Sequence, residues 1–282
     1  MKTILFPTDF SDAASRAFIY TLHLARKLEA RVITLHVFQR PDISGLMHIP
    51  RGLEELYNSI DLYEFENYRD AVPVLDGIQR DKGFTDIEVV HTIHEGKTID
   101  TILARARAEE AGLIVMGTTG ARGLKELLLG SVAGEILENA SCPVLAVPEQ
   151  AVFDGRLNRI AFTTSFQEEE FRAIDRLLDL FKPFDPVVDI VNVDLAHTEA
   201  HNRRMDQLRQ TYATYEKVDF HVLEGTDLQP TLTAFLEQQR TDLVAMVTHK
   251  RNFLAELFQY SRTKAMSYHS HIPVLSFPIG VL

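Results

Sequence analysis

A glycine-rich stretch follows a short apolar run and precedes an amphipathic segment. Residues 113–116 read Leu-Ile-Val-Met, and Gly117 and Gly120 follow directly. Gly130 and Ser131 then open a segment with apolar residues at helical spacing. Glycines let backbone amides approach a ligand closely, and a helix start adds unbonded N–H groups that favour anions. The stretch therefore predicts a site for a phosphate group, to which Ser131 could add its hydroxyl.

Two common phosphate motifs are absent from the sequence. No Gly-Lys-Ser/Thr of a P-loop occurs, and no Gly-x-Gly-x-x-Gly follows the first expected strand. A plain surface loop, in which the glycines only serve turns, is the competing interpretation.

The spacing of the stretch is more specific than its glycine content. Gly117-x2-Gly120-x9-Gly130-Ser131 resembles the nucleotide-binding pattern of the universal stress protein family. The chain start, Ile-Leu-Phe-Pro-Thr-Asp-Phe-Ser at 4–11, and Leu-His-Val at 35–37 resemble the same family. The resemblance covers residues 1–148. It implies an α/β fold of the adenine nucleotide alpha-hydrolase type, with strand order 3-2-1-4-5.

Hydrophobic periodicity predicts strands that alternate with helices in this part of the chain. Ser11 is a good N-cap for the first helix, and Pro73 is expected to break the second helix or restart it. The expected strands are 2–7, 31–37, 87–93, 112–116 and 144–147, and the expected helices are 11–29, 52–82, 97–111 and one from 131. In a parallel sheet of the implied order, ligands bind where strands 1 and 4 end. Asp9 follows strand 1 and Gly117 follows strand 4.

The resemblance also implies roles for single residues. Asp9 would offer a carboxylate to an adenine base, or it caps the first helix, and both roles can coexist. Arg122 would reach a phosphate, or it is a solvated surface side chain. The implied ligand-binding set is Pro7, Thr8, Asp9 and Val37 at the adenosine end, Met116 and Gly117 at the ribose, and Gly120, Arg122, Gly130, Ser131 and Val132 at the phosphates.

The second half of the chain repeats the first. Residues 159–166 parallel 3–10, and Ile272-Pro-Val-Leu-Ser-Phe-Pro parallels Cys142-Pro-Val-Leu-Ala-Val-Pro. The sequence thus predicts two tandem doubly wound five-stranded parallel sheets, in domains 1–148 and 159–282 with a linker at 149–158. The repeat has lost the motif: at the aligned positions stand Ser165 for Asp9, Val247 for Gly117, Lys250 for Gly120 and Tyr260 for Gly130. Only the first half is expected to bind a nucleotide.

The last strand of each half would be a sheet edge. Exposed apolar edges tend to be paired or covered. Strands 144–147 and 274–277 are therefore expected to pair antiparallel, as an intramolecular counterpart of the dimer contact that the family resemblance implies.

The composition excludes several classes of protein. The net charge of −11 argues against general binding to nucleic acid or to an anionic membrane. The chain has one cysteine, Cys142, which is expected to be buried rather than disulfide-bonded. No run of 18 apolar residues and no signal peptide is seen, which predicts a cytoplasmic protein. His197 and His201 have helical spacing but no third partner, so no metal site is predicted.

These observations favour a regulatory protein that binds ATP, ADP or AMP, with Mg²⁺ as a further candidate, and whose nucleotide state is read by an unknown protein partner. No side chain near the glycine stretch is an obvious catalytic base. A slow ATP hydrolase or phosphotransfer enzyme stays open as an alternative, and so does a scaffold that binds no nucleotide.

Overall fold

A computed structural model of the 282-residue chain describes residues 3–40, 51–118, 131–248 and 271–281. The first half alternates strands and helices in the expected order. Its elements are β1 (Thr3–Pro7), α1 (Asp12–Leu28), β2 (Arg31–Phe38), α2 (Arg51–Asp81), β3 (Val89–Glu95), α3 (Thr98–Ala108), β4 (Leu113–Gly117), α4 (Ser131–Asn139) and β5 (Val144–Val147).

The described part of the second half follows the same succession. Its elements are β6 (Arg159–Thr163), α5 (Glu168–Phe181), the 3-10 helix η1 (Lys182–Phe184), β7 (Val187–Asp194), α6 (Glu199–Thr211), β8 (Val218–Glu224), α7 (Leu228–Gln239), β9 (Leu243–Thr248), β10 (Val274–Pro278) and the 3-10 turn η4 (Ile279–Val281).

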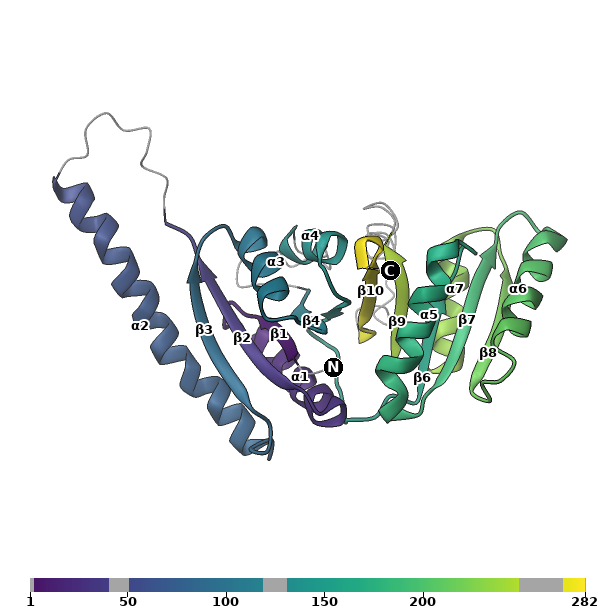
Figure 1. Ribbon diagram of the computed structural model, residues 1–282, viewed down its shortest axis with the longest axis horizontal. Coiled ribbons are helices and arrows are strands. Elements are labelled where there is room, and N and C mark those ends of the chain that lie inside the picture. Colours follow the sequence, from purple (N-terminus) through teal and green to yellow (C-terminus); the bar gives the residue numbers. More distant parts are fainter. Residues whose placement is uncertain (1–2, 41–50, 119–130, 249–270, 282) are drawn as a thin grey trace.

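The strands form one ten-stranded sheet in the order β3-β2-β1-β4-β5-β10-β9-β6-β7-β8. Each half has the order 3-2-1-4-5 and parallel pairing, which confirms the expected fold class. The halves meet at the middle of the sheet, where β5 and β10 lie side by side (Figure 1). There the pairing is antiparallel, with Leu145 opposite Leu275, as expected for the two edge strands.

Helices cover both faces of the sheet because successive side chains of a strand point to opposite faces. One apolar cluster joins alternate strand residues to α1, α2, α5 and α6. A second cluster joins the other strand residues to α3, α4 and α7. Both clusters contain residues of the two halves, so the cores continue across the β5–β10 pair.

The expectation for Pro73 was wrong. Helix α2 runs without interruption from Arg51 to Asp81, and Pro73 lies inside it. Proline removes one helical hydrogen bond, that to the carbonyl of Arg69. Pro73 and Arg69 are both exposed, so water can solvate the released carbonyl. In Figure 1 this helix stands beside β3 at one end of the sheet.

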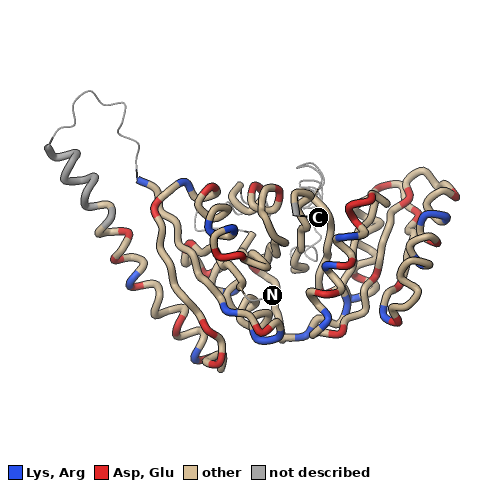
Figure 2. Tube along the Cα trace, viewed as in Figure 1, with Lys and Arg blue, Asp and Glu red and all other residues tan. Residues whose placement is uncertain are grey.

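Figure 2 shows acidic and basic residues interspersed along the helices, as on α2 and α5. Within the described ranges, no helix is both long enough and apolar enough to cross a membrane.

Candidate functional site

The loop after β1 reverses the chain within a few residues. The amide of Thr8 donates to the carbonyl of Leu35 on β2, at 2.9 Å, which extends the sheet by one bond. The Thr8 hydroxyl then accepts from the amide of Phe10 at 3.0 Å, and Phe10 has a positive φ of 58°. A positive φ is rare for a residue with a side chain, so this turn is held by its bonds rather than by local preference.

Asp9 and Ser11 lie at the start of α1. Ser11 is the N-cap, and its hydroxyl accepts from the amide of Ala14 at 3.2 Å, as predicted. Asp9 is exposed, and its Oδ1 accepts from the amide of Ser11 at 3.1 Å. This bond restrains the carboxylate, so Asp9 supports the start of α1 at the sheet edge.

β1 and β4 part as they approach this edge. β1 pairs with β2 along its full length, whereas it pairs with β4 only at Ile4 and Leu5. Beyond that point β4 pairs with β5 alone, through Val115, Met116 and Gly117. The strand order reverses between β1 and β4, which is where doubly wound sheets bind ligands.

The predicted residues lie on both sides of this parting. Thr8 and Asp9 follow β1, whereas Met116 and Gly117 end β4. Met116 is buried and Gly117 is half-buried.

Helix α4 begins at Ser131, beyond the carboxyl end of β4. Ser131 is exposed, and Val132 is half-buried against the apolar cluster under α3 and α4. The first turn of α4 contains no acidic residue, so this turn itself supplies no carboxylate to repel an anion. The other predicted phosphate residues, Gly120, Arg122 and Gly130, lie outside the described residues.

The end of β2 supplies residues that the sequence analysis did not select. Nδ1 of His36 donates to the carbonyl of Thr8 at 2.9 Å, and its ring lies 5.0 Å from that of Phe10. Tyr68 of α2 lies 6.0 Å from Phe10, and its pKa is raised by burial and by Asp76. His36 is the middle residue of the Leu-His-Val motif at 35–37, so the sequence motif could have identified it as a site residue. Val37, the residue that was selected, is half-buried beside it.

Taken together, this edge combines an exposed carboxylate, a helix start free of acidic residues and a parted pair of strands. Such an arrangement suits a ligand with an anionic group at one end and hydrogen-bond donors at the other.

Comparison with known proteins identifies the family. A model of the universal stress protein family matches residues 1–148. The chain belongs to the universal stress protein family. A universal stress protein of Methanocaldococcus jannaschii is 34% identical over 148 residues, which cover 52% of this chain and 81% of that relative. One from Thermus aquaticus is 32% identical over 147 residues, or 52% of this chain and 98% of that relative.

A crystal structure shares the fold of both halves. It is a universal stress protein of Archaeoglobus fulgidus, 18% identical, with a TM-score of 0.69. The match covers 98% of this chain and 96% of that protein. At this identity the likeness supports the universal stress protein fold alone.

In the second half, the loop after β6 corresponds to the loop after β1. Its donors are bonded to the side chain of Glu170. Glu170, on the first turn of α5, is only 3% exposed. Its carboxylate accepts from the amides of Ser165, at 3.0 and 3.1 Å, and of Gln167, at 3.0 Å. It also accepts from the hydroxyls of Thr164, at 2.6 Å, and Ser165, at 2.9 Å. The donors of this loop are therefore satisfied by Glu170.

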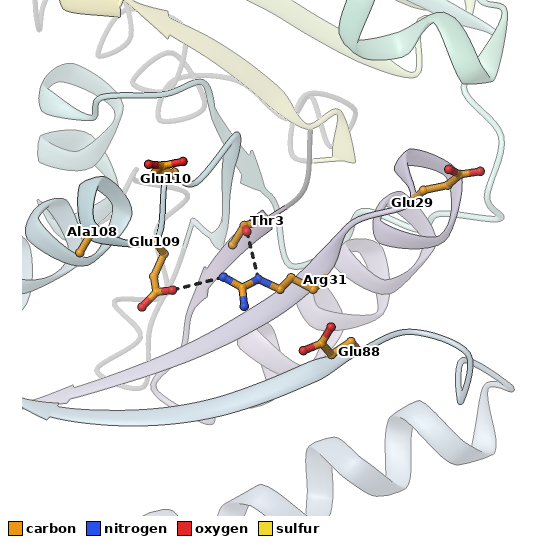
Figure 3. A pocket seen from close by; sticks show the side chains of 7 residues that line it. All are labelled: Thr3, Glu29, Arg31, Glu88, Ala108, Glu109 and Glu110. Atoms are coloured by element: carbon orange, nitrogen blue, oxygen red, sulfur yellow. Dashed lines mark hydrogen bonds and ion pairs between the residues drawn. The ribbon is translucent and has the colours of Figure 1, made fainter.

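A depression of about 670 Å³ lies at the opposite, amino-terminal edge of the first half. Figure 3 shows Arg31 in its middle, bonded to Thr3 at 3.1 Å and to Glu109 at 3.4 Å. Glu29, Glu88 and Glu110 also line it. Since glutamates outnumber the arginine, this depression does not suit a phosphate.

Proposed function

We propose that the chain binds one adenine nucleotide, ATP, ADP or AMP, at the carboxyl edge of its first half. The observation that carries the proposal is the parting of β1 and β4 beyond Leu5, which leaves Asp9 and Gly117 on opposite sides. The family membership and the intact glycine spacing at 117–131 support the same edge.

The proposed contacts follow the chemistry of each residue. Asp9 accepts hydrogen bonds from the base, and the backbone of Val37 contributes beside it, with Pro7 and Thr8 lining the pocket. Met116 and Gly117 contact the ribose. Gly120, Gly130, Ser131 and Val132 hold the phosphates through amides and the Ser131 hydroxyl, and Arg122 adds a positive charge. Because the chain carries a net charge of −11, these local donors and a bound Mg²⁺ have to offset the charge of the phosphates.

The proposed role is regulatory. The bound nucleotide sets the state of the first half, and a partner protein reads that state. A catalytic role would require a group that positions an attacking water. Asp9 Oδ1 is already bonded to the amide of Ser11, which favours binding over catalysis for this carboxylate.

The proposal includes the domain organisation. Residues 1–148 and 159–282 are two domains, and 149–158 is a linker that contacts both, since Phe153 also lies 6.3 Å from Phe184. Phe153 stacks on Tyr20 at 4.1 Å, and Leu157 is buried. The antiparallel β5–β10 pair acts as an internal dimer contact, so light scattering should report a monomer. A dimer that dissociates without unfolding would contradict the proposal that the β5–β10 pair replaces a contact between chains.

Calorimetry with ATP tests the nucleotide site. One nucleotide per chain is expected, and micromolar affinity corresponds to about −8 kcal/mol. Gly130→Tyr copies the aligned residue of the second half and should abolish binding, because the ring takes the space assigned to phosphate. Tyr260→Gly is the matched control and should bind ATP as the parent chain does.

Each other outcome identifies an alternative. Two equal sites would contradict the assignment to the first half, and no binding of any adenine nucleotide would favour a scaffold. Steady phosphate release that Gly130→Tyr removes would favour a slow hydrolase. Mass spectrometry of the native protein would identify the nucleotide that co-purifies.

A further inference from the structure

A charged cluster lies inside the second half, away from the proposed nucleotide edge. Asp189 of β7 pairs in register with Asp219 of β8, and His221 is two residues further along β8. Side chains two residues apart share one face of a sheet, so the three meet on one face. The ring of His221 lies 4.8 Å from that of Phe235, which places the cluster on the face that α7 covers.

The ligating atoms of the three side chains are close together. Nε2 of His221 is 2.8 Å from Oδ1 of Asp189, and the ligating atoms of Asp189, Asp219 and His221 lie within 4.8 Å of one another. Asp189 is fully buried, and its Oδ2 has no hydrogen bond. A buried carboxylate oxygen without a hydrogen bond is costly unless something else satisfies it.

Arg159 of β6 neutralises only part of the negative charge of this cluster. Its guanidinium lies 3.4 Å from Oδ2 of Asp189 and 3.5 Å from Oδ2 of Asp219, and it is also bonded to Gln239. Charge-assisted hydrogen bonds are shorter, about 2.7–2.9 Å. Two carboxylates share this one cation, so the cluster has a net charge of −1 when His221 is neutral.

We propose that Asp189, Asp219 and His221 bind one divalent transition-metal ion of the zinc type. One imidazole and two carboxylates are ligands that zinc accepts, whereas magnesium and calcium prefer oxygen alone. Binding requires the lone pair of His221 Nε2, so the ion replaces the bond between His221 and Asp189. Asp219 is 54% exposed at its side chain, which provides the approach from solvent.

The first half provides an internal comparison. The strand pair β2–β3 of the first half corresponds to β7–β8. At the positions of Asp189, Asp219 and His221 it has Ile33, Val90 and Thr92. These three side chains offer no comparable ligand set. One ion per chain, in the second half, is therefore expected.

Calorimetry with Zn²⁺ on the full, metal-free chain, without nucleotide, tests the site. One ion should bind, and Asp219→Asn and His221→Gln should each weaken binding at least about tenfold, since even the outer partners of metal ligands matter that much. His91→Gln is the matched control, because His91 lies on β3 with Nε2 3.0 Å from Asp76 Oδ1. That variant should bind as the parent chain does.

A second variant tests the role of Arg159. Arg159→Gln removes the competing positive charge and should tighten zinc binding, with circular dichroism as the check of folding. No saturable zinc binding would overturn the proposal. Equal binding by Asp219→Asn and His221→Gln, or an equal loss in His91→Gln, would also overturn it, as would weaker binding by folded Arg159→Gln.

Discussion

The loops that follow the first strand of each half, residues 7–11 and 163–167, have the same backbone turn. In both, a threonine hydroxyl accepts from the amide of a phenylalanine two residues later, at 3.0 and 2.9 Å. Phe10 and Phe166 both have a positive φ, of 58° and 64°. The threonine carbonyl accepts from His36 in the first half and from Asn192 in the second, at 2.9 and 2.8 Å.

The two loops differ in what binds their amides. In the first half, Asp9 serves the amide of Ser11 and remains exposed. In the second, Glu170 reaches back from α5 to the loop, whereas Ala14 holds the aligned place in the first half. A carboxylate already bonded to these donors leaves them unavailable to an incoming ligand. In the second half, the donors of this loop are thus bonded to an internal acid.

Removing that acid should have the largest effect. Glu170→Ala leaves two amides and two hydroxyls without their acceptor, which should lower the free energy of unfolding by about 2–3 kcal/mol. Denaturant titration measures it. Glu169→Ala, exposed on the same turn, is the control and should change stability by less than about 0.5 kcal/mol. Similar losses in both variants would contradict the comparison.

Transferring the acid to the first half should close the proposed nucleotide site. The double variant Asp9→Ser with Ala14→Glu copies the second loop, and its carboxylate should take the loop donors. Nucleotide affinity should fall at least about tenfold, or about 1.4 kcal/mol. Asp9→Ser with Ser15→Glu adds the same charge one residue further, and calorimetry should show a smaller loss. Equal losses would mean that the shared loss of Asp9, and not the position of the new carboxylate, lowers the affinity.

The contact between the halves is also asymmetric. Ser276 of β10 is buried and donates to the carbonyl of Leu137 on α4 at 3.1 Å, whereas Ala146 holds the aligned place on β5. The buried hydroxyl of Thr248 is also bonded to that of Ser276. Ser276→Ala should lower the free energy of unfolding by about 1–3 kcal/mol, since the carbonyl loses a donor and the Thr248 hydroxyl loses its partner. Denaturant titration measures this loss, and an unchanged midpoint would show that the bond contributes nothing.

The last prediction concerns the reactivity of Cys142, for which the smallest effect is expected. The aligned residue of the second half is Ile272. Burial raises the pKa of the Cys142 thiol to about 12. Below that pH the folded chain keeps the thiol protonated, and only the thiolate is nucleophilic. A thiol reagent at pH 8 should therefore react slowly until denaturant is added. Rapid labelling of the native chain would contradict the burial.

The sequence by itself determined the family, the fold class and the strand order. It also predicted the cap at Ser11 and the pairing of 144–147 with 274–277, both of which the structure confirms. The alternation of strands and helices and the cap depend on local patterns, since periodicity and capping residues act within a few residues of one another. The strand order, and with it the edge pairing, is what the family resemblance implied. The roles of the predicted site residues stay predictions, and Gly120, Arg122 and Gly130 lie outside the described residues.

Three other features were found only in the structure. Pro73 stays inside a helix because its surroundings are exposed. Glu170 bonds the loop because the turn at Phe166 brings the loop amides to its carboxylate. Asp189, Asp219 and His221 meet because strand register aligns residues about 30 positions apart. The contact of Asp189 with Asp219 and His221 depends on pairing between distant segments, which no local pattern in a single sequence records, whereas Glu170 bonds loop residues only three to six positions away.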